Sequence, residues 1–183
     1  MNIAVLIGVS RYSVAAPLPA CSADAEQVRK LLSATKKYDE ISCLTQNTNS
    51  GPLKDALRAF FAKYQTPSDN PSDIDEALVY FSGHGIYHQE DALLCCSDFD
   101  SNRPASTSIS NEEIDDLLRS VSPKVAVKII DACQSGSPYI KDASVGFEKA
   151  LRTSRLDSFI CMASSRLDQS SYATPEESVF TAK

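Results

Sequence analysis

Apolar runs that predict strands alternate with helical patterns along the whole chain. The first run, Asn2–Val9, is apolar almost without interruption, as expected of a strand that is covered on both faces of a sheet. Shorter apolar runs, bounded by polar or glycine-containing segments, predict further strands and a β-ribbon. The predicted strands are Glu40–Thr45, Ala77–Ser82, Lys124–Ile130 and Ser158–Ala163, with the ribbon piece at Ala92–Cys96.

Segments between these runs carry apolar residues at helical spacing. Ala25 and Leu32 share one face of the first segment, and Pro52 suits the first turn of the second. Glu112 and Glu113 fall in the first turn of the third, where carboxylates are favoured. The predicted helices are Ser22–Leu32, Gly51–Tyr64, Ser110–Arg119 and Val145–Arg152, and polar loops are predicted at Gln65–Asp75, Arg103–Ser108 and Ser137–Ser144.

The order of these elements predicts the fold class. Strands and helices alternate, which favours an α/β fold with a mostly parallel central sheet and helices on both faces, a three-layer αβα sandwich. The length of 183 residues fits one domain, and no change of composition marks a second. Because the chain ends at Ser178–Lys183 just as a new element begins, we expect residues 1–183 to be one domain that is truncated at its C-terminus.

Composition and charge exclude several classes of function. The chain is 43% hydrophobic, enough to bury a core, and its formal net charge is -6. That charge, with scattered basic residues, argues against binding to nucleic acid, which needs clustered Lys and Arg. No apolar stretch is long enough to span a bilayer, and the N-terminal run predicts a strand rather than a signal peptide. We therefore expect a soluble protein of a reducing compartment, the cytoplasm.

The cysteines raise two alternatives, a disulfide framework and a zinc site. The chain is too long and too apolar for a small disulfide scaffold, and free cysteine is a common core residue. No C-x-x-C pair occurs, and a chain with two histidines gives little support to a structural zinc site. The six cysteines are Cys21, Cys43, Cys95, Cys96, Cys133 and Cys161.

Two predicted strands run into segments with the residues of a nucleophilic site. One continues as Ser82-Gly83-His84-Gly85, and the other as Asp131-Ala132-Cys133-Gln134-Ser135-Gly136. Carboxyl ends of parallel strands meet at one edge of a sheet, so we expect the two segments to be neighbours.

Each part of these segments suits a cysteine nucleophile. The thiol of Cys133 needs a base to form the thiolate, and the imidazole of His84 titrates in the right range. The backbone N–H groups of Gly85 and Cys133 are candidates for an oxyanion hole. Taken alone, a Gly-His-Gly is more often a loop histidine and a cysteine after a strand is more often a core residue. His88 is a second candidate base, although an exposed ribbon residue is the simpler interpretation.

Together these motifs resemble the caspase-like cysteine peptidases, and more closely the metacaspase-type and bacterial members. Asp131–Gly136 is similar to the form D-[AS]-C-x-S-G, with Asp131 where caspases carry Gln. The resemblance implies the caspase-hemoglobinase fold and peptide-bond hydrolysis by a Cys133–His84 dyad. Weaker similarities lie at Ile7–Tyr12, at Leu18–Ala25 with Ala20 in place of the usual Gly, at Ala163–Ser165 with Gln169, and at Ser178–Thr181.

The resemblance also implies a substrate preference. Metacaspase-type enzymes cut after Arg or Lys, and the two acidic positions of their S1 pocket match Asp24 and Asp131. The alternative interpretation makes Asp24 a helix-capping residue and Asp131 a turn residue at the end of a strand. By the same resemblance Lys141, in the loop after the nucleophile, is a candidate site of self-cleavage.

No cofactor is expected. Some metacaspases bind calcium through acidic residues beside the site. A carboxylate cluster is usually a solvated face, so we expect no metal here. The candidate calcium ligands in this chain are Asn111, Glu112, Glu113, Asp98 and Asp100.

The expected partners are a protein or peptide substrate and a sensor or regulatory domain, with no nucleic acid and no membrane. One alternative function is a catalytically silent interaction module, and the intact pairing of His84 with Cys133 argues against it. An acyl transferase would need a G-x-[SC]-x-G elbow, and a phosphate or dinucleotide enzyme its glycine-rich loop; the sequence has neither.

Overall fold

The computed structural model describes residues 1–65, 73–134, 146, 149–152 and 158–163, with Cys133 and Gln134 described by their main chain. Its elements alternate along the chain as the sequence pattern predicts. They are β1 (Asn2–Gly8), α1 (Ala20–Thr35), β2 (Glu40–Leu44), α2 (Ser50–Ala62), β3 (Glu76–His88), β4 (Asp91–Cys95), β5 (Ser108–Ser110), α3 (Asn111–Ser120), β6 (Val125–Gln134) and β7 (Phe159–Ala163). Of the predicted helix Val145–Arg152, the described residues 146 and 149–152 are helical.

The strands form one seven-stranded sheet that is mostly parallel. Its parallel part runs in the order β2-β1-β3-β6-β7, so β3 lies at the centre between β1 and β6. The strands β4 and β5 continue from the far end of β3 as antiparallel neighbours. This arrangement confirms the predicted α/β fold and makes β3 the strand on which the rest of the sheet is organised.

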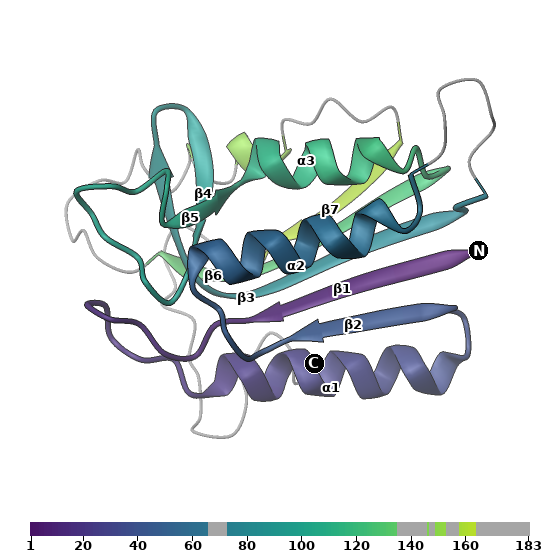
Figure 1. The fold of residues 1–183 in the computed structure, drawn as a ribbon, viewed down its shortest axis with the longest axis horizontal. Helices are drawn as coiled ribbons and strands as arrows, with labels where there is room; N and C mark the ends of the chain where they lie inside the picture. The colour runs from purple at the N-terminus through teal and green to yellow at the C-terminus, as the bar shows by residue number, and fades with distance from the viewer. Residues whose placement is uncertain (66–72, 135–145, 147–148, 153–157, 164–183) are drawn as a thin grey trace.

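Helices cover both faces of the sheet, which gives three layers (Figure 1). On one face Ala25 of α1 packs with Leu6 and Tyr80 of the central strands. On the other face Leu57 of α2 and Ile114 of α3 are part of a larger cluster. Its strand residues alternate along the central strands with those of the first cluster. Because successive strand residues point to opposite faces, the two apolar sets explain why the central strands read as continuous apolar runs.

The two strands that carry the candidate motifs are longer than the sequence predicts. Ser82-Gly83-His84-Gly85 does not end β3, which continues to His88, and β6 runs through Asp131 to Gln134. Pairing explains the difference, because β6 accompanies β3 as far as Gly85 and β4 then pairs with β3 from Gly85 onward. The motifs therefore lie inside the carboxyl ends of two paired strands rather than in turns beyond them.

The helix boundaries differ modestly from the prediction. The first helix begins at Ala20, directly after Pro19, and ends at Thr35, where Lys36 adopts a left-handed conformation. The third helix begins as predicted, because the Ser110 hydroxyl and the Glu113 carboxylate form a reciprocal capping box. The short strand β5 that precedes it is not predicted from the sequence, and only its first residue, Ser108, falls in the predicted loop.

Candidate active site

His84 and Cys133 stand opposite each other on neighbouring strands. In the parallel pair of β3 and β6, His84 is the register partner of Cys133, and Ser82 is the register partner of Asp131. Paired strands lie roughly 4.8 Å apart, so the backbones of the two residues are as close as the sheet allows. The pattern of two strand ends had predicted that they are neighbours, and the register makes them direct partners.

The imidazole of His84 is enclosed and held by the loop that follows β1. Its side chain is 3% exposed, and its Nε2 atom lies 2.8 Å from the carbonyl oxygen of Ala16. When Nε2–H donates to that carbonyl, the remaining nitrogen, Nδ1, is the one that accepts a proton. The carbonyl of Ala16 therefore fixes the tautomer of a neutral imidazole at His84.

Tyr12 contacts His84 twice. The main-chain N–H of His84 donates to the Tyr12 hydroxyl over 2.8 Å, and the centroids of the two rings are 4.5 Å apart at an interplanar angle of 45°. Neither Tyr12 nor Ala16 was predicted as a site residue. In the sequence, Tyr12 is only the last residue of the weaker family similarity at Ile7–Tyr12, and a backbone carbonyl leaves no signal in a sequence.

The two candidate specificity carboxylates are buried at the same end of the sheet. Asp24 is fully buried and Asp131 is 4% exposed, and the Ser82 hydroxyl donates to Asp24 Oδ2 over 3.4 Å. Ser82 is also the register partner of Asp131, so this serine is next to both acids. Asp24 lies inside α1 and Asp131 inside β6, so neither is the capping or turn residue of the alternative interpretation.

The comparison with known proteins gives the family. The family model described as the caspase domain matches residues 1–183. The chain belongs to the caspase-domain family. Members of this family are cysteine peptidases, so the match supports a cysteine-type hydrolase that acts on proteins or peptides. A search of curated proteins finds no match.

Two other sequence-predicted groups of this caspase-domain chain, His88 and Gly85, lie at different distances from the register pair. His88, the second candidate base, is the last residue of β3 and is the register partner of Asp91. It lies four residues beyond His84, roughly 13 Å along the strand, so it is not opposite Cys133. Gly85, the candidate oxyanion-hole residue, directly follows His84 and is the register partner of Leu94 and of Gln134.

Three of the candidate calcium ligands make hydrogen bonds within the domain. The Asn111 side-chain oxygen accepts a hydrogen bond from the buried ammonium of Lys128 over 2.9 Å, and Glu113 binds Lys54. Asp98 accepts from the N–H and hydroxyl of Ser50 at the start of α2. An oxygen that faces an ammonium does not suit a calcium ligand. Within the described part of the chain, no three His, Cys, Asp or Glu side chains are grouped to hold a metal ion.

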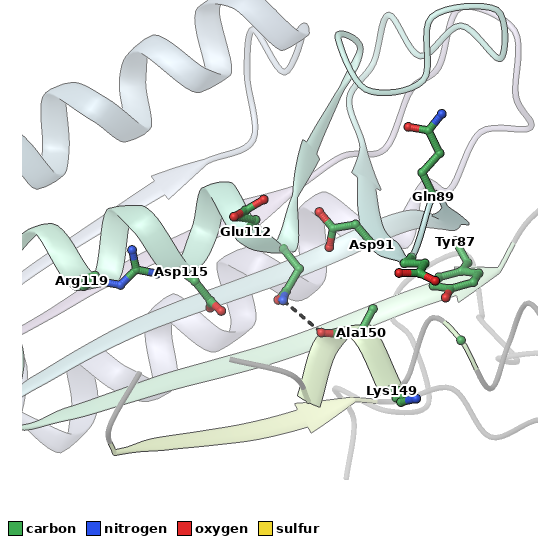
Figure 2. A pocket seen from close by; sticks show the side chains of 11 residues that line it. Tyr87, Gln89, Asp91, Glu112, Asp115, Arg119, Lys149 and Ala150 are labelled. Atoms are coloured by element: carbon green, nitrogen blue, oxygen red, sulfur yellow. Dashed lines mark hydrogen bonds between the residues drawn. The ribbon is translucent and has the colours of Figure 1, made fainter. Parts of the chain in front are cut away.

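A polar pocket of about 530 Å³ lies beside α3 (Figure 2). Acidic Asp91 and Glu112 line it together with basic Arg119 and Lys149. Burial, and then the charge of Glu112, raise the pKa of Asp91 above its ordinary value. Of the predicted site residues whose side chains the structure describes, His84, Asp24 and Asp131 do not line this pocket.

Five cysteines are free thiols in the described part of the chain: Cys21, Cys43, Cys95, Cys96 and Cys161. Burial raises the pKa of Cys95 and of Cys96 to about 12, so both are neutral thiols near pH 7.

No described helix has the length and apolar character needed to cross a membrane. The candidates Lys141, Gln169 and Ser178–Thr181 lie outside the described residues.

Proposed function

We propose that this caspase-domain protein is an endopeptidase with Cys133 as nucleophile and His84 as general base. The observation that carries the proposal is the register of β3 and β6, which puts the two residues opposite each other at the carboxyl end of the central strands. The hydrogen bond from His84 Nε2 to the Ala16 carbonyl supports it, because this bond leaves Nδ1 as the basic nitrogen. The alternative, a catalytically silent module, would not need a buried histidine in a fixed tautomer.

The reaction follows from these roles. Nδ1 of His84 takes the thiol proton of Cys133, and the thiolate adds to the carbonyl carbon of the scissile bond. The backbone N–H groups of Gly85 and Cys133 donate hydrogen bonds to the oxyanion that forms on the carbonyl oxygen. The C–N bond then breaks as the imidazolium returns the proton to the leaving amine. Water, deprotonated by His84, hydrolyses the thioester, which releases the acid and restores the thiol.

The predicted preference for Arg or Lys at P1 rests on Asp24 and Asp131. Both carboxylates are buried at the carboxyl end of the sheet, and Asp131 is two residues before the nucleophile. A buried pair of acids is complementary to a guanidinium or ammonium group, which would neutralise it. A substrate with Asp at P1 would add a third negative charge to the same place and would be rejected.

Peptides that differ only at P1 test the proposal. We expect cleavage after Arg and Lys, none after Asp, and no cleavage by Cys133→Ala. Asp131→Asn removes one charge-assisted contact and should lower kcat/KM for Arg about 10- to 100-fold. Asp55→Asn, at an exposed carboxylate of α2 that pairs with Arg58, is the matched control and should leave kcat/KM unchanged. Preference for Asp over Arg would contradict the acidic pocket, and failure of iodoacetamide to label Cys133 ahead of the other thiols would favour the silent module.

Self-cleavage at Lys141 is part of the same proposal. A domain that cuts after Lys or Arg can cut its own chain at Lys141, eight residues after the nucleophile. The variant Lys141→Gln would then keep its full length on incubation while the wild type is shortened. If both chains are processed alike, Lys141 is not the site.

A further inference from the structure

The loop after β1 supplies a partner for β3 at the point where its neighbouring strands leave a gap. The register pairs of β3 with β1 end at Ser82, and those with β4 begin at Gly85. Val9 N–H still donates to the Ser82 carbonyl over 2.9 Å. Two residues later, the N–H of His84 faces the same side and is bound by the Tyr12 hydroxyl. Tyr12 thus takes the place that a strand would occupy.

The ring of the same tyrosine lies against the imidazole. The 4.5 Å centroid distance and 45° tilt are within the range of favourable aromatic pairs. The contact therefore holds the imidazole in one orientation against the ring of Tyr12. An imidazole in a fixed orientation is placed to accept the thiol proton of its partner.

Two backbone hydrogen bonds fix the position of the segment that carries Tyr12. Ser13 N–H donates to the Ser97 carbonyl over 2.8 Å, and Leu18 N–H closes the loop onto the Ser10 carbonyl over 2.9 Å. Burial raises the pKa of Tyr12 above its ordinary value, so the hydroxyl stays neutral and does not act as a second base. The loop therefore holds a neutral aromatic group in a fixed position against His84.

We propose that Tyr12 is a positioning residue for the general base, with its hydroxyl holding the main chain of His84 and its ring holding the imidazole. The inference rests on the proposed Cys133–His84 pair and goes beyond it by assigning a role to a residue outside the dyad. Two variants separate the two contacts. Tyr12→Phe removes the hydroxyl and keeps the ring, and Tyr12→Leu removes both.

The ring contact is tested by alkylation of Cys133 with iodoacetamide at pH 7, followed by mass spectrometry of the labelled peptide. An imidazole that is no longer held in place accepts the thiol proton less effectively, so we expect Tyr12→Leu to slow alkylation about tenfold. Tyr12→Phe should stay within about threefold of the wild type, because its ring remains. In peptide hydrolysis, Tyr12→Leu should lower kcat with little change in KM. Alkylation requires no hydrolysis, so it tests Tyr12 even if the peptide assay fails.

Nuclear magnetic resonance reads both contacts directly. The chain has two histidines, so a His88→Gln background leaves His84 as the single imidazole signal. Its ring protons should show a ring-current shift that Tyr12→Phe keeps and Tyr12→Leu loses. The amide of His84 should exchange with solvent about fivefold faster in Tyr12→Phe, since one hydrogen bond is lost.

Tyr38 provides the matched control. Its hydroxyl binds the Glu76 carboxylate at the amino end of β3, away from the site. Tyr38→Phe and Tyr38→Leu should leave the alkylation rate and the His84 signals unchanged. The proposal is overturned if Tyr12→Leu is alkylated at the wild-type rate, if Tyr38→Leu slows alkylation equally, or if amide exchange at His84 is unchanged in Tyr12→Phe.

Discussion

The main chain of Gly83 lies so close to the Tyr12 hydroxyl that a Cβ atom at residue 83 would stand 2.7 Å from the hydroxyl oxygen. The same atom would stand 2.7 Å from the ring of Phe81. Gly83 lies in the middle of β3 with no left-handed backbone, so space rather than backbone freedom selects glycine here. The first glycine of Ser-Gly-His-Gly thereby keeps room for the residue that contacts His84.

Replacing this glycine should impair both stability and activity. In Gly83→Ala the methyl group displaces Tyr12 or Phe81, and overpacking of this kind costs about 1–3 kcal/mol of unfolding free energy. We expect kcat to fall at least about tenfold, the effect of a group misplaced by a fraction of an ångström. Urea denaturation and peptide hydrolysis measure the two effects.

Gly51→Ala is the control for that substitution. Gly51 lies in the first turn of α2, and a Cβ atom there meets nothing within 4 Å. Alanine should leave kcat unchanged and keep or raise stability by up to about 1 kcal/mol. Wild-type kcat in Gly83→Ala would contradict the close approach of Tyr12.

Much of the fold could be predicted because the apolar pattern reports burial directly. The strand Asn2–Gly8 and the two helix faces that cover it are visible as a continuous run and as helical spacing. The ends of β3 and β6 could not be predicted, because Gly-rich and polar residues normally leave a sheet. They stay in strands here because long-range pairing with each other and with β4 satisfies their backbone groups.

The site could be predicted only as far as its residue types carry chemistry. A histidine and a cysteine at two strand ends are informative because few other residues can act as base and nucleophile. The Ala16 carbonyl that orients His84 is 68 positions away in the chain and is chemically the same as every other carbonyl. The hydrogen bond from the His84 N–H to the Tyr12 hydroxyl depends on where β1 stops, which is a property of the assembled sheet.

Alkaline pH should destabilise the domain through its buried thiols. Burial raises the pKa of Cys95 and of Cys96 from 9 to about 12, so above pH 9 the unfolded chain loses protons that the folded chain keeps. The stability is therefore fully present below pH 9 and is lost progressively as the pH rises towards 12. Denaturant midpoints measured from pH 8 to 11 should fall, and less steeply for a Cys95→Ala, Cys96→Ala double variant. Equal slopes for the two chains would contradict the prediction.

Chelation should leave peptidase activity unchanged. The side-chain oxygen of Asn111 already accepts from Lys128, and both Glu113 oxygens lie near the ammonium of Lys54. These oxygens would have to leave cationic partners to bind calcium. Activity measured with a calcium chelator, with and without added calcium, should therefore be the same within error. Loss of activity that calcium alone restores would show that a metal site forms nonetheless.

The buried ion pair of Lys128 and Asp115 should matter more for stability than any surface pair. The ammonium of Lys128 is fully buried, lies 2.7 Å from Asp115 Oδ1 and ties the strand that carries Cys133 to α3. Lys128→Met leaves the carboxylate buried without its cation, which should cost about 3–5 kcal/mol of unfolding free energy. Lys124→Met is the matched control, because its ammonium is exposed and pairs with Asp75, and it should cost at most about 1 kcal/mol.

A second substitution distinguishes an unpaired charge from a simple packing defect in Lys128→Met. If the cost comes from the carboxylate of Asp115, then Asp115→Leu in the same chain should restore at least half of the lost stability, because apolar replacements of a buried pair are often close to neutral. Packing defects at two neighbouring positions would add instead, and the double variant would be less stable than either single one. Urea denaturation of the four chains decides between these outcomes, and an additive loss would show that Lys128 acts through its volume rather than through its charge.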